Sequence, residues 1–145
     1  MGLNQANQVD LNGLLRQAED FLAKAQTLPQ NTSADGNGGS FQLSDTIASV
    51  EIVAVANEAV ALADTETLTI KLQQSTDNGV ADAFADLLTL FTLTAAGGNG
   101  AIAAGTELGR AIVPLDAERY IKAVLVSDDA ALTGKVDVFA VYLPR

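Results

Sequence analysis

Few side chains in this sequence of 145 residues could carry chemistry. It has 18 acidic and 8 basic residues, but no histidine and no cysteine. Without histidine the chain lacks the commonest general base near neutral pH and the commonest zinc ligand, and without cysteine it can form no disulfide and no thiolate metal site. A hydroxyl nucleophile would need lysine or a carboxylate as its base.

Two pairs of neighbouring oxygen-bearing side chains could contribute to a calcium site. These are Asp77 with Asn78, and Asp128 with Asp129. Neither pair belongs to a spaced set of ligands closed by a bidentate glutamate, so we interpret both as surface turns. Two of the acidic residues could also meet in a groove and act as a catalytic pair, as in glycosidases, but no feature of the sequence identifies such a pair. We therefore predict that the protein is not an enzyme and has no cofactor and no metal site.

Two glycine-containing segments match nucleotide-binding motifs only in part. The segment from Gly98 to Ala103 fits a permissive dinucleotide fingerprint, but glycines and Pro114 interrupt the helix that must follow it. In Thr133-Gly134-Lys135, which is similar to the end of a phosphate loop, Val136 takes the position of the metal-binding hydroxyl. We read both segments as loops or turns between strands.

The formal net charge is −10, which disfavours binding to a phosphate backbone. No apolar run reaches the roughly 18 residues that would span a bilayer, and the start of the chain lacks a basic stretch followed by an apolar one. We expect a soluble protein that carries no secretion signal and binds neither nucleic acid nor membranes.

The clearest order lies near the end of the chain. The runs 119–126 and 135–142 are rich in β-branched and aromatic residues, and we predict two antiparallel strands joined in a long hairpin by 127–134. In the second run Phe139 and Val141 point to one face, while the opposite face carries Val136, Val138, Ala140 and Tyr142. A strand that is apolar on both faces needs a layer on each side or a partner chain, which first indicates a subunit of an assembly.

Further strands are predicted along the middle of the chain. The most regular is 67–73, with Leu68, Ile70 and Leu72 turned inward, and others are expected at 41–43, 48–56, 88–94 and 108–113. We read 30–40 as an exposed loop, 57–65 as a loop or helical turn, and 81–87 as one helical turn. Seven or eight strands with turns between them predict a mainly β protein, an antiparallel sandwich or barrel.

The N-terminal segment is the one stretch with helical periodicity. Apolar residues recur at intervals of three and four from Asp10, at Leu11, Leu14, Leu15, Ala18, Phe21, Leu22 and Ala25. This helix could pack on its own domain, or it could be an arm that reaches a neighbouring subunit. We divide the chain into an N-terminal arm, helical or extended, at 1–24 and a β-sandwich domain at 25–145.

Five pieces of the sequence, in this order and spacing, resemble the capsid cement or decoration proteins of tailed bacteriophages. They are Ala25-Gln26-Thr27, the segment from Thr67 to Asp77, Ala104-Gly105-Thr106-Glu107-Leu108, the segment from Val113 to Lys122, and Thr133-Gly134-Lys135-Val136. The resemblance covers roughly residues 23 to 143. It implies a jelly-roll-like sandwich that forms trimers on the outer face of the virion capsid and clamps adjacent capsomers of the major capsid protein.

The resemblance supplies no catalytic residues, so the candidate site residues are subunit contacts. We choose Leu14, Leu15, Phe21, Leu22, Arg119, Phe139 and Val141. Arg119 could pair with a carboxylate of a neighbouring subunit or locally with Asp116 or Glu118, and its replacement by alanine is expected to weaken trimers more than the monomer fold. The alternative function is a carbohydrate- or receptor-binding module on a particle surface, which the poverty of aromatic residues disfavours.

Overall fold

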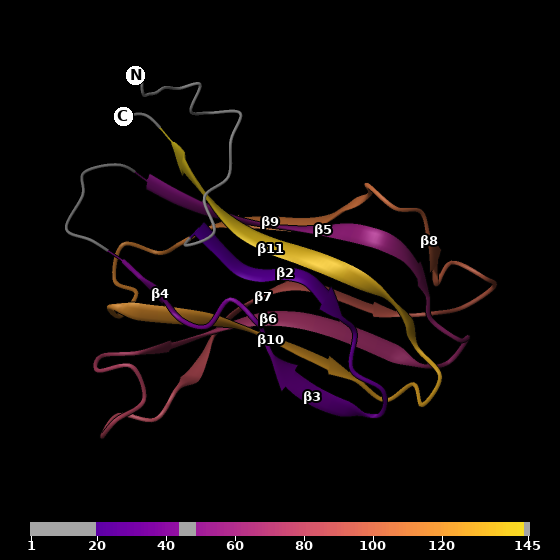
Figure 1. The fold of residues 1–145 in the computed structure, drawn as a ribbon, viewed down its shortest axis with the longest axis horizontal. Coiled ribbons are helices and arrows are strands. Elements are labelled where there is room, and N and C mark those ends of the chain that lie inside the picture. Colours follow the sequence, from indigo (N-terminus) through magenta and orange to yellow (C-terminus); the bar gives the residue numbers. More distant parts are fainter. Residues whose placement is uncertain (1–19, 44–48, 144–145) are drawn as a thin grey trace, which may run out of the picture.

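The computed structural model describes residues 20–43 and 49–143, which form an antiparallel β-sandwich (Figure 1). The helix expected at 10–24 lies largely outside the described residues. The strands are β2 (Phe21–Thr27), β3 (Thr32–Asp35), β4 (Phe41–Gln42), β5 (Ser49–Ala61), β6 (Thr67–Ser75), β7 (Ala85–Thr94), β8 (Ala101–Ile102), β9 (Glu107–Ile112), β10 (Tyr120–Ser127) and β11 (Thr133–Leu143).

The strands form two sheets with the order of a jelly roll. Sheet one runs β2-β11-β5 and ends at β8 and β9, which both pair with β5. Sheet two begins at β3 and β4, which both pair with β10, and continues through β6 to β7. Since β3 with β4 and β8 with β9 each fill one edge position, the described strands occupy four positions in each sheet, as in a double-sheet jelly roll.

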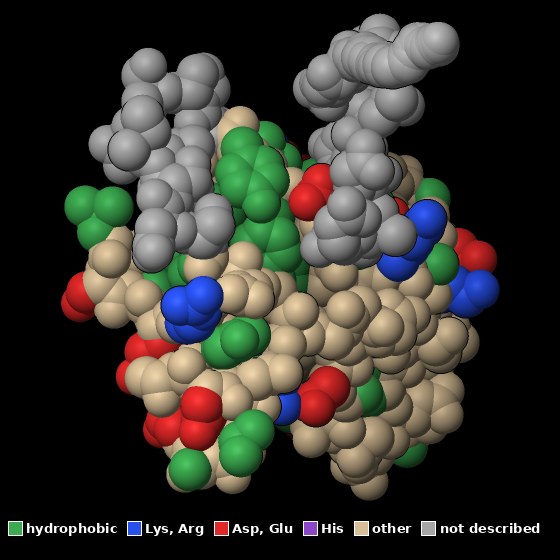
Figure 2. Space-filling model, turned by 60° about the vertical axis from the view of Figure 1, so that its left-hand side comes forward, with side chains coloured by type: hydrophobic (Ala, Val, Ile, Leu, Met, Phe, Trp, Pro, Cys, Tyr) green, Lys and Arg blue, Asp and Glu red, His purple; other side chains and the backbone are tan. Residues whose placement is uncertain are grey.

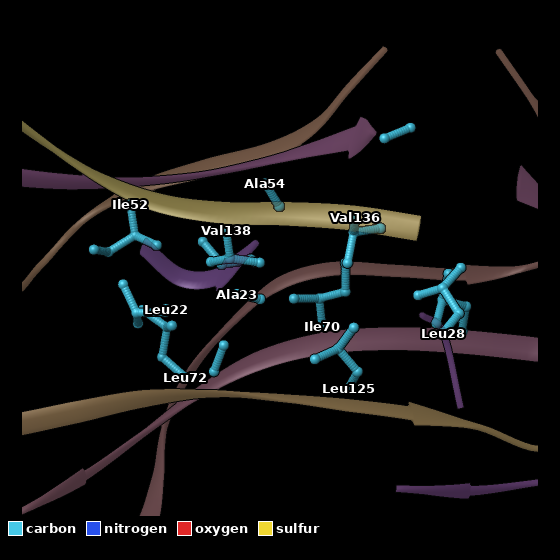
Figure 3. Packing of buried hydrophobic residues seen from close by; sticks show 14 of the residues in the cluster. Leu22, Ala23, Leu28, Ile52, Ala54, Ile70, Leu72, Leu125, Val136 and Val138 are labelled. Atoms are coloured by element: carbon cyan, nitrogen blue, oxygen red, sulfur yellow. The ribbon is translucent and has the colours of Figure 1, made fainter. Parts of the chain in front are cut away.

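The core lies between the sheets and is made of alternating side chains. Leu68, Ile70 and Leu72 of β6 are fully buried, as the sequence predicts for this strand. They face aliphatic side chains of sheet one, among them Leu22, Ile52, Val136 and Val138 (Figure 3). Burying one such side chain stabilises the fold by roughly 1.5–3 kcal/mol, so these layers hold the sandwich together.

The structure corrects the predicted hairpin near the C-terminus. Both strands exist, but β10 belongs to sheet two and β11 to sheet one, so the segment between them crosses from one sheet to the other. The neighbours of β10 are β3, β4 and β6, and those of β11 are β2 and β5. Connections between sheets are the rule among the described strands, where only β6 and β7 are consecutive and paired with each other in one sheet.

The predicted N-terminal helix is wrong over its last residues. Residues from Phe21 onward form β2, which pairs with β11 through two register shifts. Ala25 has a positive φ of 47°, and its N–H donates to the Asp137 carboxylate at 2.7 Å. The register shift between Val138 and Phe139 of β11 lets Leu22 and its neighbour Ala23 both reach the core. The sandwich therefore includes β2, and the expected boundary between 24 and 25 falls inside a strand.

Two other loop predictions also change. No helical turn is present at 81–87, where a loop leads into β7, and β5 extends through most of the segment that the sequence left ambiguous. The expected exposed loop at 30–40 contains β3 and the buried Gly36. A Cβ atom on Gly36 or Gly38 would overlap the backbone of β2, so this loop closes one side of the sandwich by a backbone approach that only glycine permits.

Candidate interaction surfaces

The described residues contain no group of three or more His, Cys, Asp or Glu side chains placed to hold a metal ion. Residues 98–103, which fit the permissive dinucleotide fingerprint, form a turn and β8. Nowhere in the two described ranges is there a helix long and apolar enough to cross a bilayer. The surfaces that remain are the outer faces of the two sheets and the two ends of the sandwich.

The outer face of sheet one carries a row of apolar side chains across its strands. Phe139 of β11 pairs with Phe21 of β2 and with Val53 of β5, and the two phenylalanine rings lie 5.7 Å apart. Phe139 and Val53 are buried, whereas Phe21 and Val141 are half-buried. The sequence-based prediction that β11 is apolar on both faces is confirmed, because Val136 and Val138 lie in the core.

An arginine between two glutamates borders this apolar row. Arg110 of β9 pairs in register with Val53, and its guanidinium contacts Glu51 at 2.8 Å and Glu107 at 2.5 Å. The hydrogen bond from Arg110 lowers the pKa of Glu107, and the same bond raises the pKa of Arg110. Because the guanidinium is half-exposed, this triad contributes little to stability and serves to hold three charges in fixed positions.

The outer face of sheet two is rich in hydroxyl groups. Thr67 and Thr69 of β6 lie opposite Thr94 and Thr92 of β7, with Oγ1 atoms 2.9 and 3.1 Å apart. Beside them is a shallow hollow of about 520 Å³, lined by Asn31, Thr32, Ser33, Thr67, Thr69, Val126, Ser127 and Asp128. Hydroxyl and amide groups around an open hollow can hydrogen-bond a polyol, although the lining includes no aromatic ring.

One end of the sandwich, which we call the loop end, holds residues 76–84 and 113–119, the start of β2 and the end of β11 (Figure 1). In the first loop the Asp77 carboxylate accepts hydrogen bonds from the N–H groups of Val80, Ala81 and Asp82 at 3.1, 2.8 and 3.1 Å. These bonds, led by that from Ala81, lower the pKa of Asp77. The loop is thus ordered from within, yet the side chain of Val80 is 86% exposed.

The second loop at this end also exposes a large apolar side chain to solvent. Leu115 is 92% exposed, at a turn in which Ala117 N–H donates to the Pro114 carbonyl at 3.1 Å. Between the sheets at the same end, the rings of Tyr142 and Phe41 lie 6.3 Å apart. Figure 2, turned to bring this side forward, shows one continuous strip of hydrophobic side chains in the upper middle of the view and other hydrophobic side chains set singly among polar and acidic ones.

The opposite end, which we call the turn end, is built from residues 28–31, 62–66, 95–100 and 128–132. Its centre is Asp129, whose carboxylate accepts from the N–H groups of Ala63 at 2.9 Å and Ala131 at 2.8 Å. The backbone carbonyl of Asp129 accepts from Asn31 N–H at 3.0 Å. Although we predicted a surface turn for Asp128 and Asp129, Asp129 is only 4% exposed. Its hydrogen bonds connect the loops 28–31, 62–66 and 128–132.

The structure separates the predicted contact residues. Leu14 and Leu15 lie outside the described residues. Phe21, Phe139 and Val141 share the outer face of sheet one, where Phe139 keeps little exposed surface. Leu22 must be corrected, because its side chain is fully buried in the core of its own chain and leaves nothing for a partner to contact.

For Arg119 the structure bears on only one of the two alternatives, the local ion pair; a pair with a carboxylate of a neighbouring subunit stays a prediction. The salt bridges of the described residues do not include it, so the expected local pair with Asp116 or Glu118 is absent there. With the Gln42 amide oriented so that its oxygen faces Arg119, the guanidinium donates to that oxygen from Nε at 3.0 Å and from Nη2 at 2.8 Å. These hydrogen bonds link β4, which contains Gln42, to the residue that precedes β10.

Sequence reasoning missed Val80, Leu115 and Asp129. The first two did leave a signal, since each is a large apolar residue inside a turn sequence, Asn78-Gly79-Val80 and Pro114-Leu115-Asp116, where no core is nearby. Asp129 left none, because its partners Ala63 and Asn31 are distant in the sequence.

Comparisons with known proteins assign no family to these surfaces: no protein-family model matches the chain, and no curated protein matches it.

Proposed function

We propose that this protein is a structural subunit of a tailed-phage virion, a decoration protein that forms trimers on the outer face of the capsid and holds neighbouring capsomers together. The observation that carries the proposal is the outer face of sheet one, where Phe21 and Val141 keep exposed apolar surface beside the buried Val53 and Phe139. This apolar surface and the sequence resemblance support the same reading.

The outer face of sheet two can be compared with the outer face of sheet one in the same chain. It shows the alternation expected of an antiparallel sheet with one wet side, with threonines outward and leucines inward. Sheet one departs from that pattern within the same chain. An apolar band bordered by the fixed charges of Arg110, Glu51 and Glu107 suits a contact between identical subunits, in which apolar area gives affinity and ion pairs fix the register.

The chemistry of the carboxylates supports a role without catalysis. The three acids with a lowered pKa, Asp77, Asp86 and Glu107, are each held by local hydrogen bonds, led by Ala81 N–H, the Gln73 amide and Arg110 respectively. A catalytic acid or base instead needs a pKa moved toward the working pH. Holding subunits together needs only buried area and hydrogen bonds, which this chain can supply.

Size-exclusion chromatography with light scattering tests the proposal. The wild-type protein should elute as a trimer, and Val141→Lys should dissociate it, because a lysine would be buried in the contact. Thr92→Lys, on the outer face of sheet two, is the matched control and should leave the trimer intact. A wild-type monomer, or equal behaviour of the two variants, would contradict the trimer contact. Added protein should also raise the temperature at which expanded shells of the same phage disassemble.

A second candidate is a carbohydrate- or receptor-binding module, and one observation favours it. The hollow on sheet two gathers the hydroxyls of Thr32, Ser33, Thr67 and Thr69 near Asn31. Titration of isotope-labelled protein with a panel of oligosaccharides would detect binding as amide shifts confined to these residues. Absence of shifts at millimolar sugar would remove this candidate and leave the structural role.

A further inference from the structure

The sequence contains four Asn-Gly pairs, and three of them lie in the described residues. These three are Asn37-Gly38, Asn78-Gly79 and Asn99-Gly100, while Asn12-Gly13 lies outside the described ranges. Asparagine is a thermolabile residue, and a following glycine favours the spontaneous loss of its side-chain amide, because glycine has no Cβ to obstruct attack by its own backbone nitrogen. In a folded chain the hydrogen bonds around each pair decide whether this attack can occur.

The reaction needs water as its only co-reactant. The backbone nitrogen of the glycine forms a bond to Cγ of the asparagine, the Cγ–Nδ2 bond breaks, and Nδ2 leaves as ammonia with the proton of the peptide N–H. Water then adds to one of the two carbonyl carbons of the resulting five-membered imide and opens the ring to aspartate or to isoaspartate, in which the main chain runs through the side chain. The asparagine side chain must therefore be able to rotate, and the glycine N–H must be able to lose its proton.

Asn37 meets neither requirement. Its Oδ1 accepts from Lys24 N–H at 2.8 Å and its Nδ2 donates to the Lys24 carbonyl at 2.9 Å, so the amide pairs with β2 as a neighbouring strand would. The attacking group is held as well, because Gly38 N–H donates to the Leu22 carbonyl at 3.0 Å. Three hydrogen bonds would have to break before Cγ and the glycine nitrogen could meet, so this pair should be inert in the folded protein.

Asn99 is held by one side-chain bond and by the packing of the glycine that follows it. Its Oδ1 accepts from Ala96 N–H at 2.7 Å. Gly100 is buried against the Leu62 carbonyl, and Leu62 N–H donates to the Gly100 carbonyl at 3.0 Å. The backbone here cannot turn its nitrogen toward Cγ without separating the loops 62–66 and 95–100, so this pair should also react slowly.

Asn78 differs from both. It is exposed in the loop after β6, and none of the hydrogen bonds formed by the described residues uses its side chain. Asn78 and Gly79 have positive φ angles of 64° and 80°, so the backbone turns sharply here. The attack is opposed by a single bond, from Gly79 N–H to Ser75 Oγ at 2.8 Å. The side chain that carries Cγ is therefore free to rotate, unlike those of Asn37 and Asn99.

We propose that Asn78 is a site of spontaneous deamidation, and that the fold protects the other two described Asn-Gly pairs from the same reaction. Isoaspartate at this position adds one atom to the main chain before Gly79. The added atom displaces the Gly79 N–H from Ser75 and disturbs the N–H groups that surround the Asp77 carboxylate. The loop thus loses internal order as the protein ages. The reaction involves only this chain and water, so it is independent of the proposed decoration function.

Peptide mass spectrometry after incubation tests the assignment. Full-length protein kept in a mildly alkaline buffer should convert Asn78 to aspartate and isoaspartate at least about tenfold faster than Asn37 or Asn99, because each further hydrogen bond that must break is equivalent to roughly tenfold in rate. In urea, where the fold is lost, the three peptides should convert at similar rates. Equal rates in the folded protein, or the same ranking in urea, would overturn the proposal.

The amide signals of residues 75–82 in isotope-labelled protein give a second readout. They should shift during incubation of the wild type, because isoaspartate moves Gly79 away from Ser75. Asn78→Ser removes the reacting amide and should leave these signals unchanged under the same treatment. Asn99→Ser, at an exposed position of the turn end, is the matched control and should age at this loop as the wild type does. Shifts that persist in Asn78→Ser, or that disappear in Asn99→Ser, would contradict the assignment.

Discussion

The two ends of this sandwich are stabilised in different ways. At the turn end, Asp129 joins loops that are distant in the sequence, and its carboxylate is almost completely buried. At the loop end, Asp77 orders only the loop that contains it and leaves Val80 exposed above that loop. The first arrangement contributes to the stability of the whole fold, and the second shapes a surface. The comparison predicts that mutations at the turn end unfold the protein, whereas mutations of exposed loop-end residues leave the fold intact.

The largest effect should come from Asp129→Ala. It leaves two part-buried N–H groups, those of Ala63 and Ala131, without acceptors, at about 1–3 kcal/mol each. We expect the free energy of unfolding to fall by about 3 kcal/mol, measured by urea denaturation. Asp64→Ala, which removes a single exposed bond to Gly98 N–H, is the control and should cost less than about 1 kcal/mol. Similar losses in the two variants would show that Asp129 has no central role.

A second turn-end change, Gly100→Ala, should cost about 2 kcal/mol by overpacking. An added Cβ would overlap the Leu62 carbonyl oxygen, and Gly100 and Leu62 are joined by the hydrogen bond from Leu62 N–H to the Gly100 carbonyl at 3.0 Å. Gly98→Ala nearby is the control, since it has open space but a positive φ of 83° and should cost about 1 kcal/mol. Thermal unfolding of both variants would rank them, and a larger loss for Gly98→Ala would contradict the close approach at Gly100.

The loop end should respond to pH through Asp77. Its pKa is lowered in the folded chain, so its contribution to stability is present above the ordinary value near 3.8 and is lost as the pH falls through the folded-state pKa. The difference in stability between wild type and Asp77→Asn should therefore be larger at neutral pH than at a pH below the lowered folded-state pKa of Asp77. Urea midpoints across this range measure it. Asp116→Asn removes a charge from the neighbouring loop as a control, and a difference for Asp77→Asn that is constant with pH would contradict the assignment.

Where the pattern of the sequence was local, it predicted the fold. The alternation from Thr67 to Gln73 identified β6 and its inward residues, and the doubly apolar run around Phe139 identified β11. The pairing of strands was not local. Nothing in residues 127–134 distinguishes a hairpin from a crossing between sheets, because that choice depends on how β10 and β11 each pair with distant strands.

The error at 21–25 arose from periodicity that tertiary contacts override, and the error at 81–87 arose from local side-chain hydrogen bonds. In β2, the spacing of Phe21, Leu22 and Ala25 satisfies a helix, but a register shift lets a strand bury Leu22 and Ala23 together. In the second segment, the carboxylates of Asp77 and Asp82 hold the backbone in a loop instead of a helical turn. As for the candidate surfaces, the sequence placed Phe139 and Val141 on one face of a strand, but it assigned Phe21 to a helix. That Phe21 joins them, and that Val80 and Leu115 lie at the same end, required the strand order.

The smallest expected effect is that of Val80→Ser on the isolated protein. Because the side chain is 86% exposed and the loop is held by Asp77 and Ser75 through backbone N–H groups, the substitution removes no packing and no hydrogen bond. The free energy of unfolding should change by less than about 0.5 kcal/mol in urea denaturation. Leu90→Ser, at a buried position of the adjacent β7, is the contrasting control and should be strongly destabilising. A large loss for Val80→Ser would mean that the residue supports the fold itself, and the contrast between the two ends would then fail.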